Sequence, residues 1–442
     1  MRRACVILGA LGLAGCGLAL DLDPQPPATG EIDAGTAPAP DAGIIEALDA
    51  AADAGSAPDA GSDAAVIGPL VDAGPPACDH TVCPWGCAPM ACAVPAQLAV
   101  GARHACVLTD MGSAFCWGDD NEGQVTGTPG MPVLRPTRVL AADGRFVQLD
   151  AGGSHTCALT ASGALVCWGR NGEGQLGGTA AAAIVRTPPT ADPGVQVRTG
   201  ARHTCMRSAA GQVWCWGASD RGQSGVLMTR TTRTAIVFPI DESATDLAVG
   251  ADFGCAATAT AVYCWGDNAR FQVSVMGPGP FPSAQATMLG PVGALALGGR
   301  FGVLRDRGQL RSWGDDSSLQ LGDSIVDGTG YAARPVAIGT GTAGAFGVGD
   351  AHGCADMGTR VACWGANGAG QLATGAPGAP VGVPMPSRFM PDLVAIDGGD
   401  LSTCVLTRDH VVLCAGANGR GQLGDGTTTP RADPTMALPL PG

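Results

Sequence analysis

The chain has 442 residues with 25 Lys plus Arg against 39 Asp plus Glu, a formal net charge of −14, 69 Gly and only 4% aromatic residues. Eleven of the acids fall within residues 17–77, which hold no base, so the rest of the chain is close to neutral and has no basic stripe. This distribution argues against nucleic-acid binding, which needs clustered cations, and the composition favours short strands with glycine turns over long helices.

Residues 1–15 predict an export signal. Two arginines precede an apolar run, residues 4–13, that is too short to span a bilayer. Residues 13–16, Leu-Ala-Gly-Cys, resemble a bacterial lipobox, so we expect cleavage before Cys16 and lipid attachment to its thiol. Two or three acyl chains hold a protein stably on a membrane. Gly17 after the cysteine favours the outer membrane of a bacterial envelope, and an ordinary secretory signal is the alternative.

Two short segments precede the main body of the chain. Residues 16–77 repeat Asp-Ala-Gly and predict a disordered tether, because they can bury little apolar surface. Residues 78–95 predict a small module with two disulfides, whose connectivity the sequence leaves open among three possibilities. A zinc knuckle using His80 is the alternative, although the spacing differs from the usual paired C-x2-C arms. The four cysteines are Cys78, Cys83, Cys87 and Cys92.

A repeat of about 50 residues fills residues 96–442 and marks a repeat architecture. Each copy has Cys-Trp-Gly or a variant of it, and a Gln follows seven residues after the Trp position. A residue present in every copy should serve the fold, whereas a residue found in one copy is free to serve function. The Trp position reads Trp117, Trp168, Trp216, Trp265, Trp313, Trp364 and Ala415, and the Gln is Gln124, Gln175, Gln223, Gln272, Gln320, Gln371 and Gln422.

The second copy predicts four antiparallel strands, at 136–140, 146–150, 155–160 and 164–169, which is typical of a propeller blade. The fold class expected is therefore an all-β, seven-bladed propeller. The first copy lacks a counterpart of 136–140, and the last copy has an additional strand at 434–438. We expect this last strand to complete the first blade and close the ring, which removes an exposed edge.

Twelve cysteines flank the predicted hairpins in pairs. Facing residues of antiparallel strands lie within disulfide range, so each pair predicts a bond, with buried free thiols as the alternative. The fifth copy has Val303 and Ser312 instead, so both cysteines are missing together, as a bond requires. The pairs are Cys106 with Cys116, Cys157 with Cys167, Cys205 with Cys215, Cys255 with Cys264, Cys354 with Cys363, and Cys404 with Cys414.

Histidines and acidic loops also recur. Four histidines share one position with Phe253, Phe301 and Ser402, which indicates packing or backbone hydrogen bonding, with a ring of pH-sensitive groups near the channel as the alternative. Acidic residues after several Trp-Gly steps predict solvated turns, because none matches a complete calcium loop. We expect no metal, cofactor or catalytic residue. The histidines are His104, His155, His203 and His352, and the acidic residues include Asp119, Asp120, Asp267, Asp315 and Asp316.

Each copy resembles the regulator of chromosome condensation repeat, and residues 152–177 match its consensus almost throughout. The resemblance implies a seven-bladed propeller closed by mixing the chain ends, with the Trp-Gly and Gly-Gln-Leu-Gly positions joining neighbouring blades. It transfers function poorly: the eukaryotic founder exchanges nucleotide on a small GTPase and contacts chromatin, whereas a bacterial relative inhibits β-lactamase.

The sequence therefore predicts a monomeric, lipid-anchored, non-catalytic binding protein. Its partner would be a protein or a cell-envelope polymer, bound on one propeller face. Two alternatives remain: a regulator or inhibitor of an enzyme or GTPase, and a hydrolase or lyase in the channel, which carboxylates or histidines from single blades would favour. Copies 3 to 5 depart most from the repeat, and their apolar and Arg side chains are the types that interfaces use. The predicted partner-binding residues are Arg221, Arg230, Arg233, Phe271, Met276 and Phe281.

Overall fold

The computed structural model describes residues 83–88, 91–139, 145–178, 184–187, 192–236, 238, 242–287, 289–325, 329–336 and 343–438. Cys16, Cys78 and the predicted segments 1–15 and 16–77 lie outside these residues, as does the start of the module predicted at 78–95. No helix in the described part of the chain has the length and apolar character needed to cross a bilayer.

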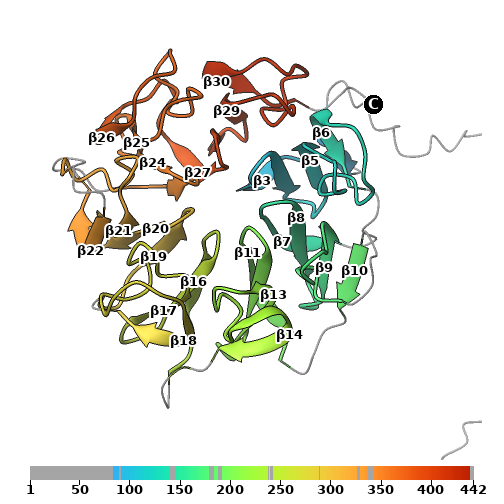
Figure 1. Cartoon of the computed structure of the whole chain (residues 1–442). Coiled ribbons are helices and arrows are strands. Elements are labelled where there is room, and N and C mark those ends of the chain that lie inside the picture. Colours follow the sequence, from blue (N-terminus) through green and yellow to red (C-terminus); the bar gives the residue numbers. More distant parts are fainter. Residues whose placement is uncertain are drawn as a thin grey trace, which may run out of the picture. The chain divides into compact units, whose positions relative to one another are not determined.

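The described residues form seven four-stranded antiparallel sheets arranged in a ring, as Figure 1 shows. In every sheet the strands follow one another in chain order from the channel outward, and a small hairpin of β1 (Cys87–Ala88) and β2 (Ala91–Cys92) precedes the first sheet. Blades 1 to 3 are β3 (Pro95–Val100), β4 (His104–Thr109), β5 (Ala114–Gly118), β6 (Val133–Arg138); β7 (Phe146–Ala151), β8 (His155–Thr160), β9 (Leu165–Gly169), β10 (Ile184–Thr187); and β11 (Gly194–Thr199), β12 (His203–Ser208), β13 (Val213–Ser219), β14 (Met228–Ile236). Blades 4 and 5 are β15 (Asp246–Val249), β16 (Phe253–Ala257), β17 (Val262–Gly266), β18 (Phe281–Ala286); and β19 (Ala294–Leu297), β20 (Phe301–Asp306), β21 (Gln309–Asp315), β22 (Thr329–Pro335). Blades 6 and 7 are β23 (Phe346–Val348), β24 (His352–Asp356), β25 (Val361–Gly365), β26 (Val381–Pro386); and β27 (Leu393–Gly398), β28 (Ser402–Thr407), β29 (Val412–Gly416), β30 (Arg431–Met436).

The prediction that residues 434–438 complete the first blade is wrong. They overlap β30, which pairs with β29 as the outer strand of blade 7, whereas blade 1 has its own outer strand, β6. The strand predicted at 136–140 to open the second blade is this same β6. A repeat period fixes the spacing of strands but not which of four consecutive strands begins a blade, so the sequence allowed a shift by one strand.

The ring closes through contacts between whole blades 7 and 1. The Trp117 indole Nε1 donates to the Gln422 carbonyl at 2.9 Å, and the Val100 amide donates to Asp397 Oδ2 at 2.7 Å. His410 Nδ1 lies 2.9 Å from the Pro95 carbonyl. No exchanged strand is therefore needed to hold the chain ends together.

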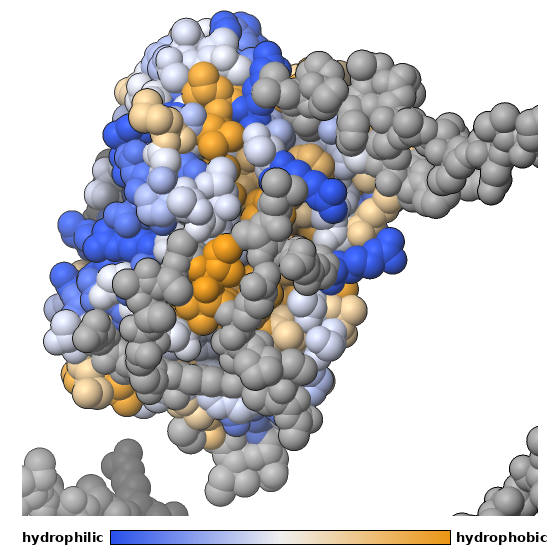
Figure 2. All heavy atoms as spheres, turned by 90° about the vertical axis from the view of Figure 1, so that its right-hand side faces the viewer, coloured by the Kyte–Doolittle hydropathy of each residue, from blue (hydrophilic) through white to orange (hydrophobic). Residues whose placement is uncertain are grey.

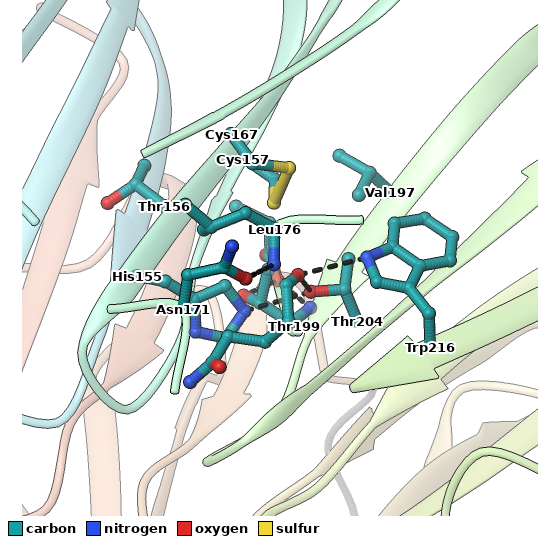
Figure 3. Close-up of a disulfide and its surroundings, with 12 residues drawn as sticks. His155, Thr156, Cys157, Cys167, Asn171, Leu176, Val197, Thr199, Thr204 and Trp216 are labelled. Carbon is teal, nitrogen blue, oxygen red and sulfur yellow. Dashed lines mark hydrogen bonds between the residues drawn. A yellow bond between two sulfur atoms is a disulfide. The ribbon is translucent and has the colours of Figure 1, made fainter. Parts of the chain in front are cut away.

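Six disulfides predicted within the blades are confirmed. Each joins directly opposite residues of the two middle strands with a Cα–Cα distance of 4.1 Å. Figure 3 shows the Cys157–Cys167 bond inside blade 2. In blade 5, Val303 and Ser312 face each other at the same position.

The small module before blade 1 has a disulfide between Cys83 and Cys92. Cys78 lies outside the described residues, so the pairing of Cys78 and Cys87 stays a prediction. Trp85 of this module is 7% exposed and meets Phe115 edge to face, within a core cluster shared by blades 1 and 7. The module therefore covers the seam at which the ring closes.

The recurring Gln connects each blade to the next through its backbone carbonyl. In every blade that carbonyl accepts a hydrogen bond at 2.8–3.1 Å from the following blade, given either by a Trp indole or by a Thr hydroxyl. Figure 3 shows both donors, Thr204 and Trp216, near the loop of blade 2. The Gln side chains close their own loops by accepting the amide two residues earlier.

The aspartates of the acidic turns are buried, so the expectation of solvated turns is wrong for them, whereas Glu122 is exposed. Asp120 and Asp316 are each 2% exposed, and each accepts the amide five residues later, at 2.8 Å and 3.0 Å respectively. Asn171, Asn268, Asn367 and Asn418 do the same in other blades. These side chains organise the loop after each Trp-Gly step, because Asp and Asn readily accept nearby backbone amides.

Candidate functional site

The recurring histidines join blades rather than lining a site. In His104, His155 and His352, Nε2 lies 2.8–2.9 Å from a Thr hydroxyl of the following blade. Each hydroxyl already donates to a Gln carbonyl, so the imidazole must donate to the hydroxyl, which fixes the Nε2–H tautomer. The sequence predicted packing or backbone hydrogen bonding at this position, and the Nε2 partner of these three histidines is a side-chain hydroxyl. Burial lowers the pKa of these histidines to about 3 or 4, so they are neutral near pH 7.

His203 is the exception, because the following blade has Gly254 where the others have Thr. Neither of its ring nitrogens has a hydrogen-bond partner among the described residues, and the side chain is fully buried. Phe253 and Phe301 occupy the same position ahead of Gly302 and Gly353. At the other junctions that have His or Phe here, a His faces a Thr of the following blade and a Phe faces a Gly. Only the junction of blades 3 and 4 combines His with Gly.

The inner strands enclose a central channel of about 1000 Å³. Its charged residues at mid-strand come from three blades, Asp150 on β7, Arg198 on β11 and Asp397 on β27. Across the ring, blades 5 and 6 contribute the apolar side chains of Leu297 and Phe346. The inner-strand position of Asp150, Arg198 and Asp397 is occupied in the other four blades by Ala99, Ala248, Ala296 and Gly347.

Both mid-strand carboxylates of the channel are held by the neighbouring blade. Asp150 Oδ2 accepts the Thr199 amide and hydroxyl, each at 2.7 Å, and Asp397 Oδ2 accepts the Val100 amide at the same distance. Arg198 Nη1 lies 3.9 Å from Asp150 Oδ1. Burial, followed by the negative charge of Asp150, raises the pKa of Asp397 to about 7. This group can therefore exist in both protonation states near neutral pH.

Sequence reasoning missed these channel residues, although a signal was present. Asp150, Arg198 and Asp397 each stand five residues before the recurring His position, where the other copies have Ala or Gly. Comparing the seven copies at this position would have identified all three as residues found in single blades.

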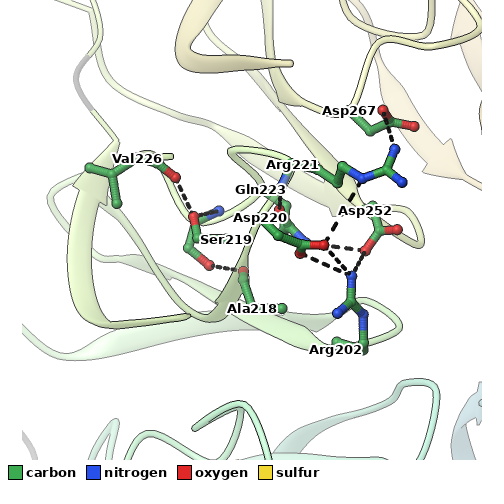
Figure 4. Close-up of polar contacts among 10 residues, drawn as sticks. Arg202, Ala218, Ser219, Asp220, Arg221, Gln223, Val226, Asp252 and Asp267 are labelled. Carbon is green, nitrogen blue, oxygen red and sulfur yellow. Dashed lines mark hydrogen bonds and ion pairs between the residues drawn. The ribbon is translucent and has the colours of Figure 1, made fainter. Parts of the chain in front are cut away.

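A second polar cluster joins blades 3 and 4 at the loops after the Trp-Gly steps, as Figure 4 shows. Arg202 Nη2 lies 3.0 Å from Asp220 Oδ1 and 3.5 Å from Asp252 Oδ1, and Arg221 Nη1 lies 3.3 Å from Asp267 Oδ1. Burial raises the pKa of Asp252, whereas hydrogen bonds from Gln223 and Arg202 outweigh burial and lower the pKa of Asp220. Arg202 and Arg221 thus neutralise carboxylates of two blades.

The predicted partner-binding residues lie in loops and outer strands of blades 3 and 4. The Arg221 side chain is 48% exposed and pairs with Asp267, and Phe281 is half-buried against a core cluster. Arg230 and Arg233 belong to β14. Met276 is 78% exposed. Phe271 has a φ of 61°, in the left-handed region that its glycine counterparts in blades 1 to 3 also adopt.

Exposed apolar residues are not confined to blades 3 and 4. Met131 of blade 1 is 84% exposed. Figure 2, seen from the side of blades 1 and 2, shows apolar side chains in separate patches between polar ones. No group of three or more His, Cys, Asp or Glu in the described ranges is placed to hold a metal ion.

Comparison with known proteins identifies the repeat. The family model for the Regulator of chromosome condensation (RCC1) repeat matches residues 96–124, 146–175 and 195–223, and a second model of that name matches 111–159. The chain is 41% identical over 83 residues to the probable E3 ubiquitin-protein ligase HERC4 of Homo sapiens, covering 18% of this chain and 8% of that protein. It is 45% identical over 64 residues to alsin of Rattus norvegicus, covering 14% of this chain and 4% of alsin. The chain thus matches less than a tenth of the length of either relative.

Two solved structures share the fold. Prp20p from Saccharomyces cerevisiae has a TM-score of 0.65 at 17% identity, over 73% of this chain and 85% of that one. Human WBSCR16 has a TM-score of 0.64 at 21% identity, over 74% of this chain and 93% of that one. The chain therefore carries regulator of chromosome condensation repeats, folded as a seven-bladed β-propeller.

Proposed function

We propose that the protein is an envelope-anchored, non-catalytic binding module that uses blades 3 and 4 to bind another protein. The observation that carries this proposal is the exposure of single-blade apolar residues in the segments leading to the outer strands. Leu227 and Met228 of blade 3 are 53% and 59% exposed, and Val275 and Met276 of blade 4 are 49% and 78% exposed. Exposed apolar side chains beside charged ones are typical of interfaces.

The disulfides support an extracytoplasmic location. Seven bonds occur in the described residues, and disulfides persist mainly in oxidising compartments. The lipobox-like residues 13–16 and the acidic residues 17–77 would then supply a lipid anchor on Cys16 and a tether. We place the anchor in the bacterial outer membrane and the propeller, as a monomer, at the end of the tether.

The fold supports protein binding as its mode of action. Prp20p is described by its binding to Gsp1p and to histones. In this chain the recurring polar groups of the blades are engaged in holding neighbouring blades together, so they are not available for a reaction. Guanine-nucleotide exchange on a GTPase, or inhibition of a partner enzyme, would be a particular form of the same binding role.

The proposal predicts that two substitutions in blade 4 remove the partner. Met276→Glu places a charge on an exposed apolar side chain, and Phe271→Gly removes an aromatic ring from a backbone conformation that favours glycine. After crosslinking on intact cells and mass spectrometry, we expect each variant to recover at least tenfold less partner than the unaltered protein. Phe271→Gly should also raise stability by about 1 kcal/mol, because it relieves left-handed strain.

The matched control is Met131→Glu, the same substitution at an equally exposed methionine of blade 1. Recovery of the partner should be unchanged in this variant. If the two blade 4 variants recover as much partner as the unaltered protein, blades 3 and 4 are not the binding surface.

A second candidate is a hydrolase or lyase site in the channel. Asp150 and Asp397 are carboxylates from single blades, and the pKa of Asp397 is raised to about 7 by burial and by Asp150, as a general acid or base would need. Against this candidate, both side chains already accept hydrogen bonds from the adjacent inner strand. The mid-strand carboxylates therefore hold adjacent blades together, and the channel is also lined by Asp350 and Asp400, whose pKa values are raised by burial.

Asp397→Asn tests this channel group. A carboxyl whose pKa is raised in the folded state stabilises the fold below its unfolded pKa and loses that contribution as pH rises towards 7. The asparagine variant should therefore gain stability relative to the unaltered protein between pH 4 and 7, by at most about 1.4 kcal/mol per pH unit. Chemical denaturation across this range measures the difference. A channel enzyme would also show turnover of chromogenic ester or glycoside substrates that Asp397→Asn abolishes, and the binding role predicts none.

A further inference from the structure

The inner strand of each blade has one unpaired edge, which faces the channel. In an antiparallel sheet, alternate residues turn their N–H and C=O groups away from the neighbouring strand. The Gly101 amide donates to the His104 carbonyl, so the amides of Leu98 and Val100 point towards the channel. The corresponding bond is present in all seven blades, so each inner strand presents two such residues to the channel. In blades 3 to 5 they are residues 197 and 199, 247 and 249, and 295 and 297.

Blade 3 shows how the preceding blade closes this edge. Asp150 Oδ2 accepts the Thr199 amide at 2.7 Å, and Gln148 Oε1 accepts the Val197 amide at 2.8 Å. The same glutamine donates from Nε2 to the Val197 carbonyl at 3.1 Å. Aspartate or glutamine side chains also reach the inner edges of blades 1, 2 and 4, in the pairs Asp397 with Val100, Gln97 with Val147, and Gln196 with Leu247.

The inner edge of blade 5 lacks such a side chain. Blade 4 has Ala248 where blade 2 has Asp150, and its Asp246 accepts an amide of its own strand. Among the described residues, no side chain forms a hydrogen bond with the backbone of Leu295 or Leu297. All four residues of β19 are partly exposed, whereas each of the other inner strands has buried residues. The ladder of β19, at the inner end of blade 5 in Figure 1, is therefore open to the channel.

Two carboxylates at the mouth of the channel lie close to this edge, Asp350 of blade 6 and Asp400 of blade 7. A Cβ atom on Gly299, two residues beyond β19, would collide with Asp350 Oδ1, so this carboxylate lies next to the end of the strand. Neither carboxylate forms a hydrogen bond or an ion pair in the described part of the chain, and Arg300 and Arg103 act on them only at longer range. Burial raises the pKa of both, and the charge of Asp400 raises the pKa of Asp350 further. A positively charged side chain placed here would stabilise both carboxylates.

The channel has room for an extended chain. Its volume of about 1000 Å³ lies at the upper end of the range for ligand sites, roughly 300–1,000 Å³. An extended peptide supplies alternating N–H and C=O groups that match an open ladder, and basic side chains complement the mouth. A polyamine has no such backbone groups, and an acidic peptide would be repelled by Asp350 and Asp400. Among the described residues the inner edge of blade 6 is open as well, but two of the three residues of β23 are buried, so β19 is the better strand for pairing.

We propose that the channel binds an extended, basic segment of a partner protein, which pairs with the inner edge of β19 and places a Lys or Arg side chain beside Asp350 and Asp400. This inference goes beyond the proposed function, because it assigns a second contact surface that does not involve the outer segments of blades 3 and 4. Backbone hydrogen bonds to Leu295 and Leu297 supply affinity, and the two carboxylates select for positive charge.

The test titrates the full-length, disulfide-bonded protein by calorimetry with an acetylated, amidated hexapeptide that alternates Lys and Ala. Ala248→Asn places a side-chain oxygen at the position from which Asp150 holds the Thr199 amide, so it should close the β19 edge without adding charge. The matched control is Ala99→Asn, the same substitution at the same inner-strand position of blade 1, which faces blade 2 instead. Thermal melting establishes that both variants are folded.

We expect Ala248→Asn to weaken peptide binding about tenfold and Ala99→Asn to leave it unchanged. The same hexapeptide with methylated backbone nitrogens should not bind, which tests the ladder without altering the protein. Asp350→Asn should also weaken binding, whereas Asp409→Asn, in an exposed hairpin of blade 7, should not. A hexapeptide that alternates Glu and Ala should not bind.

Absence of binding by the Lys–Ala peptide, or equal effects of Ala248→Asn and Ala99→Asn, would overturn the proposal. Equal binding of the methylated peptide or of spermidine would also overturn it, since charge alone would then account for binding. These results do not depend on the outer segments of blades 3 and 4, whose role is measured separately by Met276→Glu, so the failure of either proposal can be recognised without the other.

Discussion

Reduction of the six blade disulfides is expected to unfold the propeller. Each bond closes a loop of about ten residues, for which the loop-entropy model gives about 2–3 kcal/mol. Six such contributions sum to about 15 kcal/mol, which is as large as the whole stability of a typical domain. The folded state should therefore not persist at 37 °C once all six bonds are broken.

Reduction should also be slow, because the sulfur atoms are enclosed. All twelve blade cysteines are 0–1% exposed, so a dithiol reaches them only when a blade opens. Thermal melting after equilibration with dithiothreitol, compared with brief treatment, measures both effects. Expression in a reducing cytoplasm should give insoluble protein, and a soluble, cooperatively melting reduced protein would contradict the expectation.

Blade 5 provides the matched control for a single bond. Changing Cys157→Val together with Cys167→Ser copies the Val303 and Ser312 pair of that blade into blade 2. This double variant should remain folded, with a free energy of unfolding lower by about 2–3 kcal/mol. A loss much larger than this would mean that the cysteines of blade 2 contribute by packing as well as by their bond.

The repeat made the architecture predictable from the sequence. Its period, its paired cysteines and its glycine turns each depend on neighbours within one blade. The left-handed glycines Gly112, Gly163 and Gly211 of the three-residue hairpins have φ values of 77–81°. The strand permutation could not be read in this way, since it depends on contacts between the first and last copies. The burial of Asp120 was also missed, because composition alone makes an acidic loop look solvated.

The candidate site was predicted less well, for a physical reason. Arg221 reads as a free cation in sequence, but it neutralises Asp267 of the next blade. Asp150 and Asp397 read as isolated carboxylates in the sequence, and the charge of Asp150 acts on Asp397 only because blades 2 and 7 face the same channel. Contacts between blades join residues about 50 or more positions apart, and a repeat pattern does not specify which single-blade residues they bring together.

Lowering the pH is expected to destabilise the propeller through its buried histidines. Burial lowers the pKa of His104, His155 and His203 from 6.5 to about 3, and that of His352 to about 4. Below pH 6.5 the unfolded chain binds protons that the folded chain excludes, so this contribution is complete above pH 6.5 and is lost as pH falls. In this range each histidine lowers the free energy of unfolding by about 1.4 kcal/mol for each unit that the pH falls. The raised pKa values of the channel and loop carboxyls act in the opposite direction, so single-residue variants are needed to isolate the effect.

His203→Phe and His155→Phe separate the histidine contribution from packing. His203 has two ring nitrogens without a partner among the described residues, and it faces Gly254. Blades 4 and 5, which also face a glycine, have Phe at this position. His203→Phe should therefore stabilise the protein by about 1–3 kcal/mol at pH 7, because a buried unsatisfied group is removed. It should also reduce the slope of stability against pH by about 1.4 kcal/mol per unit below pH 6.5.

His155→Phe should remove the same pH dependence but destabilise the protein at pH 7. Its Nε2 donates to the Thr204 hydroxyl at 2.9 Å, and Phe can neither make this bond nor find the space that a facing glycine leaves. The expected loss is about 1–3 kcal/mol from the hydrogen bond and overpacking. Denaturation between pH 4.5 and 7.5 compares the two variants. If the two substitutions change the free energy of unfolding at pH 7 in opposite directions and reduce its pH dependence equally, the choice of His or Phe follows the facing residue of the next blade. If both change it in the same direction, the facing residue does not determine the choice.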